Sequence, residues 1–312
     1  MHKFILAAAA VVALALPAQA QQKYKFAVIP KAMNNPFFDV ARDGCLARAK
    51  ELGNVECIYK GPIEHEPATE SQIIQDFITQ KVDGMAISVA DVASATKVIK
   101  SAMDAGIPVI TFDADAPDSA RIAYIGTNNK DFGLALGKKL LALRPEGGKY
   151  AMVSGGPGAR NLAERVEGVR EALKGSKWVE VSGSPTFCND DVTLAVQQMN
   201  DLKTATPDLA AIVPVGGWPM FAPEGFKVFV NKHKAEIDAG KFTLVVADTL
   251  RSQLELLRDG YGNALVGQRP YEMGVKSMDT LLALKKGEKV PAIIFTGLDT
   301  VTKDNVAKML GN

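Results

Sequence analysis

The sequence predicts an α/β protein made of two doubly wound parallel-sheet lobes. Short runs rich in valine and isoleucine alternate with stretches in which apolar residues recur every three or four positions. This pattern is typical of buried parallel strands joined by helices. The same strand-then-helix rhythm occurs once in each half of the chain, so we expect one such lobe from each half.

The expected strands follow one another in chain order. In the first half they are residues 26–29, 55–59, 84–89, 109–112 and 122–125. In the second half they are residues 150–153, 179–181, 211–215, 244–247 and 264–266. Helical spacing fills the intervals, as in residues 71–80 and 92–105. A last apolar run, residues 292–296, can return to either lobe.

The first twenty residues have the pattern of a secretory signal peptide. An apolar run from Phe4 to Leu16 is followed by Ala18-Gln19-Ala20, and the run is too short to span a membrane. We expect cleavage after Ala20 and export of a periplasmic or extracellular protein. The remaining residues, at roughly 150 per domain, agree with two domains.

Composition argues against several classes of protein. The chain has 36 Lys and Arg against 35 Asp and Glu, a balance that does not favour nucleic-acid binding or a polybasic membrane surface. It lacks metal-ligand spacing and a G-x-S-x-G nucleophile motif, so we expect no metal, no cofactor and no catalytic residue. His65 and His233 lie in charged stretches and are expected to be solvated.

The connection between the halves predicts a cleft. Residues 126–129 have no linker composition, so the lobes should lie close together, with a cleft at the carboxyl ends of their strands. Open α/β sheets bind ligands at that edge.

Polar and aromatic residues follow the strands of the first half. Asn35 precedes Pro36 as a helix N-cap and can also reach the cleft. We expect one of Phe37 and Phe38 in the core and the other stacked on a sugar ring, with both in the core as the alternative. Asp113 and Asp115 follow a buried strand, and a carboxylate there can accept two hydroxyl groups; the alternative for Asp115 is a turn or cap.

The second half offers a comparable set. Residues 154–158 form a glycine-rich turn that we interpret as a tight turn rather than a nucleotide site. It leaves Asn161 and Arg165 at the start of a helix. Arg165 can bind two neighbouring hydroxyls or pair with Glu164 or Glu167.

Three further candidates come later in the chain. Trp218 directly follows a strand and can cover the ligand or lie in the core. Asp248 ends an apolar strand as Asp113 does, and this recurrence strengthens both assignments. Gln268 can reach the cleft or bind backbone.

At these positions the sequence resembles the periplasmic sugar-binding proteins of the ribose/galactose type, which serve ABC transporters. The resemblance covers essentially the whole mature chain, and its matching stretches are residues 34–38, 106–113, 124–129, 164–168, 246–248 and 267–270. It implies the type 1 periplasmic binding protein fold. It also implies that Phe37 and Phe38 pack on the sugar, and that Asn35, Asp113, Arg165, Asp248 and Gln268 bind ring hydroxyls.

The chain departs from that family at several contacts. Ala114 stands where the ribose-type pattern has arginine, and Gly216-Gly217 stand where it has an Asn-Asp pair. None of residues 188–190 is aromatic, although the family often brings an aromatic from the second lobe near this place. The particular sugar therefore does not carry over.

The cysteines suggest one disulfide. The periplasm is oxidising, and the first helix should pack beside the second strand, so we expect Cys45 to pair with Cys57 and Cys188 to remain free. The alternative is two buried free thiols.

We therefore expect a monomeric receptor that captures a sugar or polyol and delivers it to a membrane permease, with a chemoreceptor or sensor kinase as a possible second partner. The alternatives are a secreted α/β enzyme acting on a sugar, or a repressor effector domain; the latter would need a DNA-binding helix-turn-helix where the leader stands. We expect a three-strand hinge, with residues 23–127 and 268–297 in the first lobe and 128–267 and 298–312 in the second.

Overall fold

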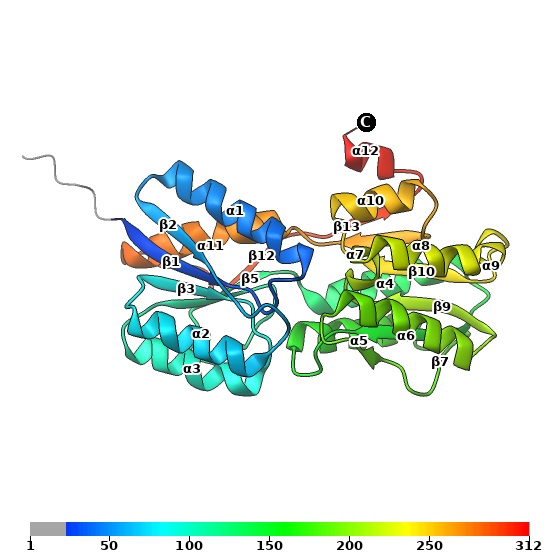
Figure 1. Ribbon diagram of the computed structural model, residues 1–312, viewed down its shortest axis with the longest axis horizontal. Helices are drawn as coiled ribbons and strands as arrows, with labels where there is room; N and C mark the ends of the chain where they lie inside the picture. The colour runs from blue at the N-terminus through cyan, green and yellow to red at the C-terminus, as the bar shows by residue number, and fades with distance from the viewer. Residues whose placement is uncertain (1–22, 312) are drawn as a thin grey trace, which may run out of the picture.

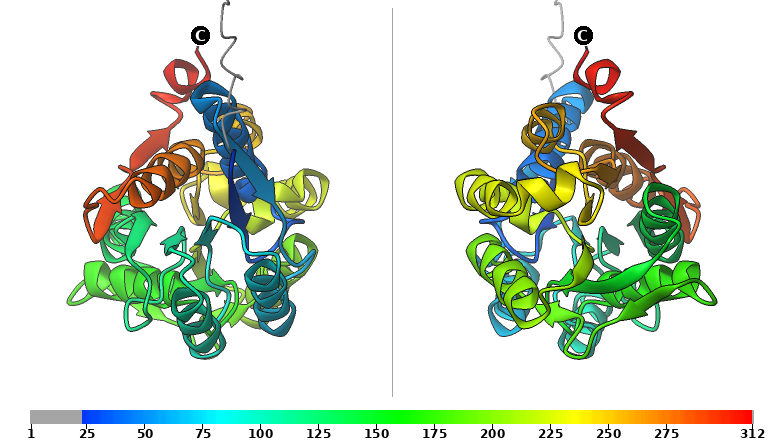
Figure 2. Two further views of the ribbon diagram at one scale, coloured as in Figure 1. Left: turned by 90° about the vertical axis from the view of Figure 1, so that its left-hand side faces the viewer. Right: turned by 90° about the vertical axis from the view of Figure 1, so that its right-hand side faces the viewer.

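The computed structural model describes residues 23–311. The predicted signal peptide lies outside these residues. Two lobes lie side by side along the long axis, with the β-sheet of each lobe flanked by helices (Figure 1). The views along that axis show the helices around the outside of the sheets (Figure 2). The predicted fold class is confirmed.

The first lobe contains a six-stranded parallel sheet in the order β12-β5-β4-β3-β1-β2. Its strands are β1 (Tyr24–Ile29), β2 (Val55–Tyr59), β3 (Gly84–Ile87), β4 (Val109–Phe112), β5 (Ala123–Gly126) and β12 (Ile293–Phe295). The helices are α1 (Pro36–Leu52), α2 (Pro67–Thr79), α3 (Val92–Asp104) and α11 (Pro270–Lys285). Helices α1 and α11 cover one face of this sheet, and α2 and α3 cover the other (Figure 1).

The second lobe contains a seven-stranded sheet, in which the order β13-β11-β10-β9-β6-β7 is completed by β8 beside β6. Its strands are β6 (Gly148–Ser154), β7 (Trp178–Glu180), β8 (Thr186–Phe187), β9 (Leu209–Pro214), β10 (Thr243–Ala247), β11 (Ala264–Gly267) and β13 (Asp299–Thr302). The helices are α4 (Asn129–Leu143), α5 (Arg160–Leu173), α6 (Val192–Ala205), α7 (Trp218–Phe221), α8 (Pro223–Lys232), α9 (Lys234–Asp238), α10 (Arg251–Arg258) and α12 (Val306–Leu310).

Two strands were not predicted. β8 has only two residues, and β13 is a polar edge strand that pairs antiparallel with β11. Neither has the apolar run that marks a buried parallel strand. β3 ends at Ile87 rather than residue 89. Ser88, which follows it, donates its hydroxyl to the side chain of Asp113.

Short polar side chains cap the beginnings of α1, α3 and α6. The side chain of Asn35 accepts the N–H of Phe37 at the start of α1, and Asp91 accepts the N–H of Ser94 in α3. Asp191 does the same for α6. These caps satisfy N–H groups that have no partner within the helix.

The chain passes between the two sheets three times. The passages follow β5, β11 and β12, and they lie beside one another. Thr296 donates its N–H to the carbonyl of Gly126 at 2.8 Å, and Thr127 Oγ1 donates to Gln268 Oε1 at 2.9 Å. These bonds make the three passages one narrow connection, about which the lobes can rotate relative to each other.

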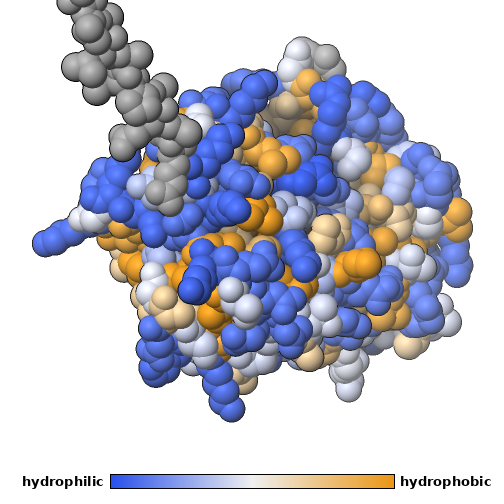
Figure 3. Space-filling model, turned by 60° about the vertical axis from the view of Figure 1, so that its left-hand side comes forward, coloured by the Kyte–Doolittle hydropathy of each residue, from blue (hydrophilic) through white to orange (hydrophobic). Residues whose placement is uncertain are grey.

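The surface is mixed in character. Figure 3 shows one face, on which hydrophobic residues are scattered among hydrophilic ones. Within residues 23–311, no helix is both long and apolar enough to cross a membrane.

Candidate functional site

A cavity lies between the lobes, at the carboxyl ends of the strands. Its lining comes from both lobes and from the connection between them: Lys31, Asn35, Phe37, Phe38, Asp113, Asn161, Leu162, Arg165, Asp190, Gly216, Trp218, Asp248 and Gln268. Nine of the ten predicted ligand-binding residues are in this set, and Asp115 is not.

Three buried carboxylates of the cavity share an unusual backbone conformation. Asp113, Asp190 and Asp248 have φ values of 57°, 62° and 72°, in the left-handed region. Residues other than glycine rarely adopt it, although aspartate and asparagine tolerate it best. At Asp113 and Asp248 the chain turns directly after β4 and β10, with each side chain directed into the cavity. Such strained conformations cluster at ligand sites.

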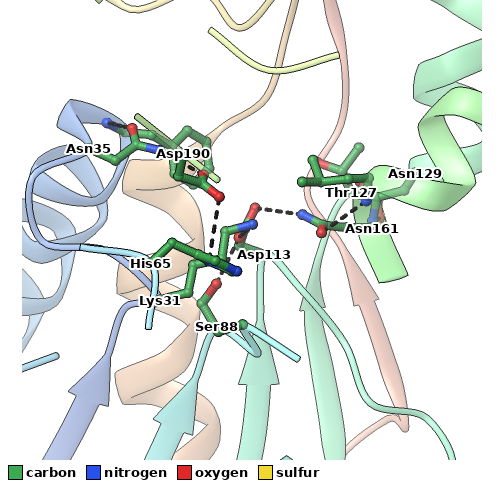
Figure 4. Close-up of polar contacts among 12 residues, drawn as sticks. Lys31, Asn35, His65, Ser88, Asp113, Thr127, Asn129, Asn161 and Asp190 are labelled. Atoms are coloured by element: carbon green, nitrogen blue, oxygen red, sulfur yellow. Dashed lines mark hydrogen bonds and ion pairs between the residues drawn. The ribbon is translucent and has the colours of Figure 1, made fainter. Parts of the chain in front are cut away.

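The Asp113 carboxylate is held from both lobes. Within the first lobe, Ser88 Oγ donates to its Oδ2 at 2.8 Å, and Lys31 Nζ lies 3.9 Å from the same oxygen. From the second lobe, Asn161 Nδ2 donates to Oδ1 at 3.4 Å (Figure 4). Asp113 is 3 % exposed, so these partners stabilise a charge that has left water.

Asp248 occupies the corresponding place in the second lobe. Gln268 Nε2 donates to its Oδ1 at 2.7 Å, and the N–H of Gly217 donates to Oδ2 at 3.0 Å. Burial raises the pKa of Asp248, while the positive charge of Arg165 and these hydrogen bonds act in the opposite direction.

Arg165 connects α5 to the hinge. Its guanidinium donates to Asn129 Oδ1 and Gln268 Oε1, both at 2.9 Å, and to the carbonyl of Val215 at 3.0 Å. The same group lies over the ring of Phe132, 4.5 Å from its centroid. The alternative of an ion pair with Glu164 or Glu167 is not what the structure shows, since Arg160 and Lys130 bind those two carboxylates.

Asp190 and Lys31 line the cavity and were not predicted as site residues. Asp190 Oδ1 accepts Trp218 Nε1 at 2.8 Å and, across the cleft, Asn35 Nδ2 at 3.4 Å. Asp190 lies at the position where the resemblance implies an aromatic ring, and the sequence does not predict a carboxylate ligand there. Lys31 follows β1 and is 2 % exposed. Its position at the end of a buried strand is the sequence feature that could have identified it as a site residue.

Both phenylalanines line the cavity while remaining largely buried. Phe38 is 1 % exposed and meets Phe112 edge to face, at 6.1 Å between centroids. Phe37 is 4 % exposed and meets Phe38 in the same way at 5.2 Å. The division into one core ring and one cleft ring does not hold, because both rings contribute to the core and to the wall of the cavity.

Asp115 lies away from this cavity. Arg121 donates to both of its oxygens, at 2.8 and 2.6 Å, and Thr111 Oγ1 also donates to it. Asp115 accepts the N–H of Ala116 as well, so it serves the turn that was its alternative role.

The glycine-rich turn has a different role from the one expected. Among Gly155, Gly156 and Gly158 none has a positive φ, so the backbone conformation does not require glycine. The surroundings do: a Cβ on Gly155 would meet Trp218, and a Cβ on Gly156 would meet the ring of His65 in the other lobe. The glycines allow close approach of neighbouring groups rather than a tight turn.

The expectation that both histidines are solvated is wrong. The side chain of His65 is 6 % exposed and packs at the interface of the lobes. That of His233 is 12 % exposed and lies against Phe229 and Phe242. Both sit in charged stretches, but the folding of neighbouring elements over them is a tertiary effect that local sequence does not show.

Cys45 and Cys57 form a disulfide between α1 and β2, with Cα atoms 6.1 Å apart. Cys188 is free and buried, and burial raises the pKa of its thiol.

The chain is similar to known proteins over most of its length. Residues 26–289 match the family model described as periplasmic binding protein domain. The ribose import binding protein of Escherichia coli is 27% identical over 300 residues, which are 96% of this chain and 97% of that protein. The D-ribose/D-allose-binding protein of Pseudomonas aeruginosa is 26% identical, over 88% of this chain and 86% of that protein.

Solved structures agree with these matches. An ABC transporter solute-binding protein from Burkholderia graminis, in complex with D-arabinose, is 34% identical with a TM-score of 0.82, covering 92% of this chain and 98% of that one. A solute-binding protein from Agrobacterium vitis with bound D-fucose is 28% identical with a TM-score of 0.84, covering 92% and 99%.

Proposed function

Since the chain belongs to the periplasmic binding protein domain family, we propose that it is a receptor that captures a sugar or sugar-like polyol between its lobes. The loaded receptor delivers this ligand to the permease of an ABC transporter. The relatives named for sugar import and the structures with bound sugars support this role.

The observation that carries the proposal is the convergence of hydroxyl-binding groups on one cavity. Three carboxylates, three side-chain amides and an arginine from different elements line it together with two phenylalanine rings. Carboxylates and amides accept and donate to ring hydroxyls, and the rings pack on the apolar face of a sugar. We propose the nine lining residues named from the sequence as ligand contacts, together with Lys31 and Asp190.

The charges of the cavity favour a neutral ligand. The lining has three carboxylates, Asp113, Asp190 and Asp248, but only two cationic groups, Lys31 and Arg165. An added carboxylate or phosphate would bring further negative charge into a buried site that already has an excess of it. Neutral pentoses, hexoses and polyols should therefore bind more tightly than the corresponding sugar acids.

The relatives are binding proteins by name, and we propose that this chain too has no enzymatic activity. The alternative is an enzyme acting on a sugar. Incubation of a bound sugar with the purified protein, followed by chromatography, distinguishes the two, because a receptor returns the sugar unchanged.

A thermal-shift screen tests the proposed function. The protein without residues 1–20 is heated with pentoses, hexoses, polyols and sugar acids, and a ligand that binds only the folded state raises the melting temperature. At a concentration of 100 times Kd the stabilisation is about 2.7 kcal/mol. If no sugar or polyol shifts the melting temperature, the proposed function is refuted. Separately, expression of the full chain, purification from the periplasm and mass spectrometry of the N-terminus test cleavage after Ala20.

A further inference from the structure

A second contact between the lobes lies on the side of the cavity away from the hinge. In Figure 4, His65 and Lys31 stand on one side of Asp113, and the hinge residues Thr127 and Asn129 stand on the other. The glycine-rich turn of the second lobe faces His65 and the start of α3 at this place. The ligand contacts described above do not account for that turn.

We propose that the turn formed by residues 156–158, together with His65 and Asp91 of the first lobe, is an interlobe lock that stabilises the closed receptor. The turn, His65 and Asp91 are referred to below as the lock. Its effect on ligand retention rests on the proposed function, but its existence as a closing contact does not.

The first argument is the fit of the backbone. The N–H of Val92, at the first position of α3, donates to the carbonyl of Gly158 at 3.3 Å. This N–H has no partner within its own helix, so the other lobe satisfies it. A Cβ on Gly158 would lie 3.0 Å from Cγ and 3.2 Å from Cβ of Asp91, which only glycine avoids.

The second argument is the fit of the imidazole. A Cβ on Gly156 would lie 2.7 Å from Cε1 and 2.9 Å from Cδ2 of His65, closer than side chains approach each other. Gly156 is buried, and its φ is not positive. Glycine is therefore required by the opposing lobe and not by its own backbone.

The third argument is a polar pair with no other partners. His65 Nδ1 lies 3.6 Å from Asp190 Oδ2 of the second lobe, and neither atom has a hydrogen-bond partner within the described residues. Unpaired buried polar atoms are costly, so a small further approach that joins these two would favour closure. Because Asp190 also lines the cavity, the lock is continuous with the ligand site.

Cross-linking tests the lock without any ligand. The double variant D91C/G158C removes the Asp91 carboxylate that a Cβ on Gly158 would meet. It leaves the two Cβ atoms 3.2 Å apart, so a small separation of the lobes brings them to the roughly 3.5–4.5 Å of a disulfide. Mild oxidation should remove two free thiols and leave Cys188, giving a chain that migrates faster on a non-reducing gel. The control pair D91C/G225C should not cross-link, since a Cβ on Gly225 meets nothing nearer than Val196 in its own lobe, at 3.5 Å. Absence of the first cross-link, or equal rates for both pairs, would overturn the lock.

A third substitution tests the role of His65. Adding G156A to the D91C/G158C pair should slow cross-linking by about tenfold or more, because the new methyl group meets the imidazole. Adding H65A as well should restore the rate, whereas adding G225A in place of G156A should leave it unchanged. If G156A has no effect, or if H65A does not rescue it, the assigned fit is wrong. All of these outcomes are independent of whether a sugar binds.

Discussion

The two strand-end aspartates offer the sharpest test of the site. We predict that Asp113→Asn and Asp248→Asn each weaken binding of the sugar identified by the thermal screen. Asparagine keeps the shape of the side chain and tolerates the left-handed φ of 57° and 72° at these positions. It removes the negative charge and also replaces one acceptor oxygen with an NH2 donor, so the charge-assisted part of each ligand hydrogen bond sets the smallest expected loss.

The expected size follows from the partners that each carboxylate already has. Asp113 accepts Ser88 and Asn161, and Asp248 accepts Gln268 and the N–H of Gly217. Each carboxylate offers about four acceptor sites, so each retains capacity for ligand hydroxyls. A hydrogen bond to a charged group contributes about 1.5–3 kcal/mol and a neutral one about 0.5–1.5 kcal/mol. The loss is therefore about 1–1.5 kcal/mol per hydroxyl, or roughly a 5- to 13-fold rise in Kd.

Isothermal titration calorimetry measures this change, and chemical unfolding of the free protein provides the control. Asp113→Ala and Asp248→Ala should lose the ligand bond entirely, and each should also lower the free energy of unfolding by about 1–2 kcal/mol, because alanine is strained at positive φ. Two asparagine variants that bind like the parent would refute the site. Alanine variants as stable as the asparagine variants would refute the argument from backbone strain.

Four further outcomes can be checked on the same protein. Reduction of the Cys45–Cys57 disulfide should lower the free energy of unfolding by about 3 kcal/mol, given a sequence separation of 12. Denatured, unreduced protein should show one free thiol, and three free thiols would contradict the pairing. Burial raises the pKa of Glu70 from 4.5 to about 8, so the folded protein holds a proton on this carboxyl. The free energy of unfolding should therefore fall as pH rises from 4.5 to 8, and Glu70→Gln should flatten that part of the pH–stability curve. An unchanged slope in the variant would contradict the raised pKa of Glu70. Burial in the closed form also lowers the pKa of His65 from 6.5, so protonation of His65 should oppose closure. Ligand affinity should therefore fall as pH drops below 6.5 in the parent but not in His65→Gln. Equal pH dependence of affinity in the two proteins would count against this role of His65. Small-angle scattering with saturating sugar should show a smaller radius of gyration than without it, and an unchanged value for a bound sugar would exclude closure as the signal to the permease.

The fold and much of the cavity lining could be predicted from the sequence because the signals are local. Asp113 and Asp248 each interrupt an apolar run where a buried strand ends, and that interruption is visible in the chain. Asn35 is marked as a cap by the proline that follows it. In contrast, the role of Asp190 depends on Trp218 and on Asn35 of the other lobe, both distant in sequence, and no local pattern records these contacts.

The turn at residues 155–158 shows most clearly what local sequence leaves out. Glycines between a strand and a helix usually indicate a backbone conformation that other residues avoid. Here the backbone is ordinary, and the constraint on Gly156 and Gly158 comes from His65 and Asp91, which are distant in sequence and belong to the opposite lobe. A glycine required by a distant partner cannot be told from one required by its own φ until both lobes are in place.

The positions of Ala114 and Asp190 in the structure also explain two departures from the ribose-type pattern. Ala114 is fully buried in the core, so it offers no group to a ligand where that pattern has arginine. Asp190 takes the place near which an aromatic ring was sought, with Trp218 donating to its Oδ1. A ring held in this cavity would therefore meet the phenylalanines of the first lobe, and Trp218 together with an oriented carboxylate from the second. This arrangement favours a ligand with a hydroxyl directed at Asp190, and deoxy analogues lacking that hydroxyl should bind more weakly because the carboxylate would remain buried without a partner on Oδ2.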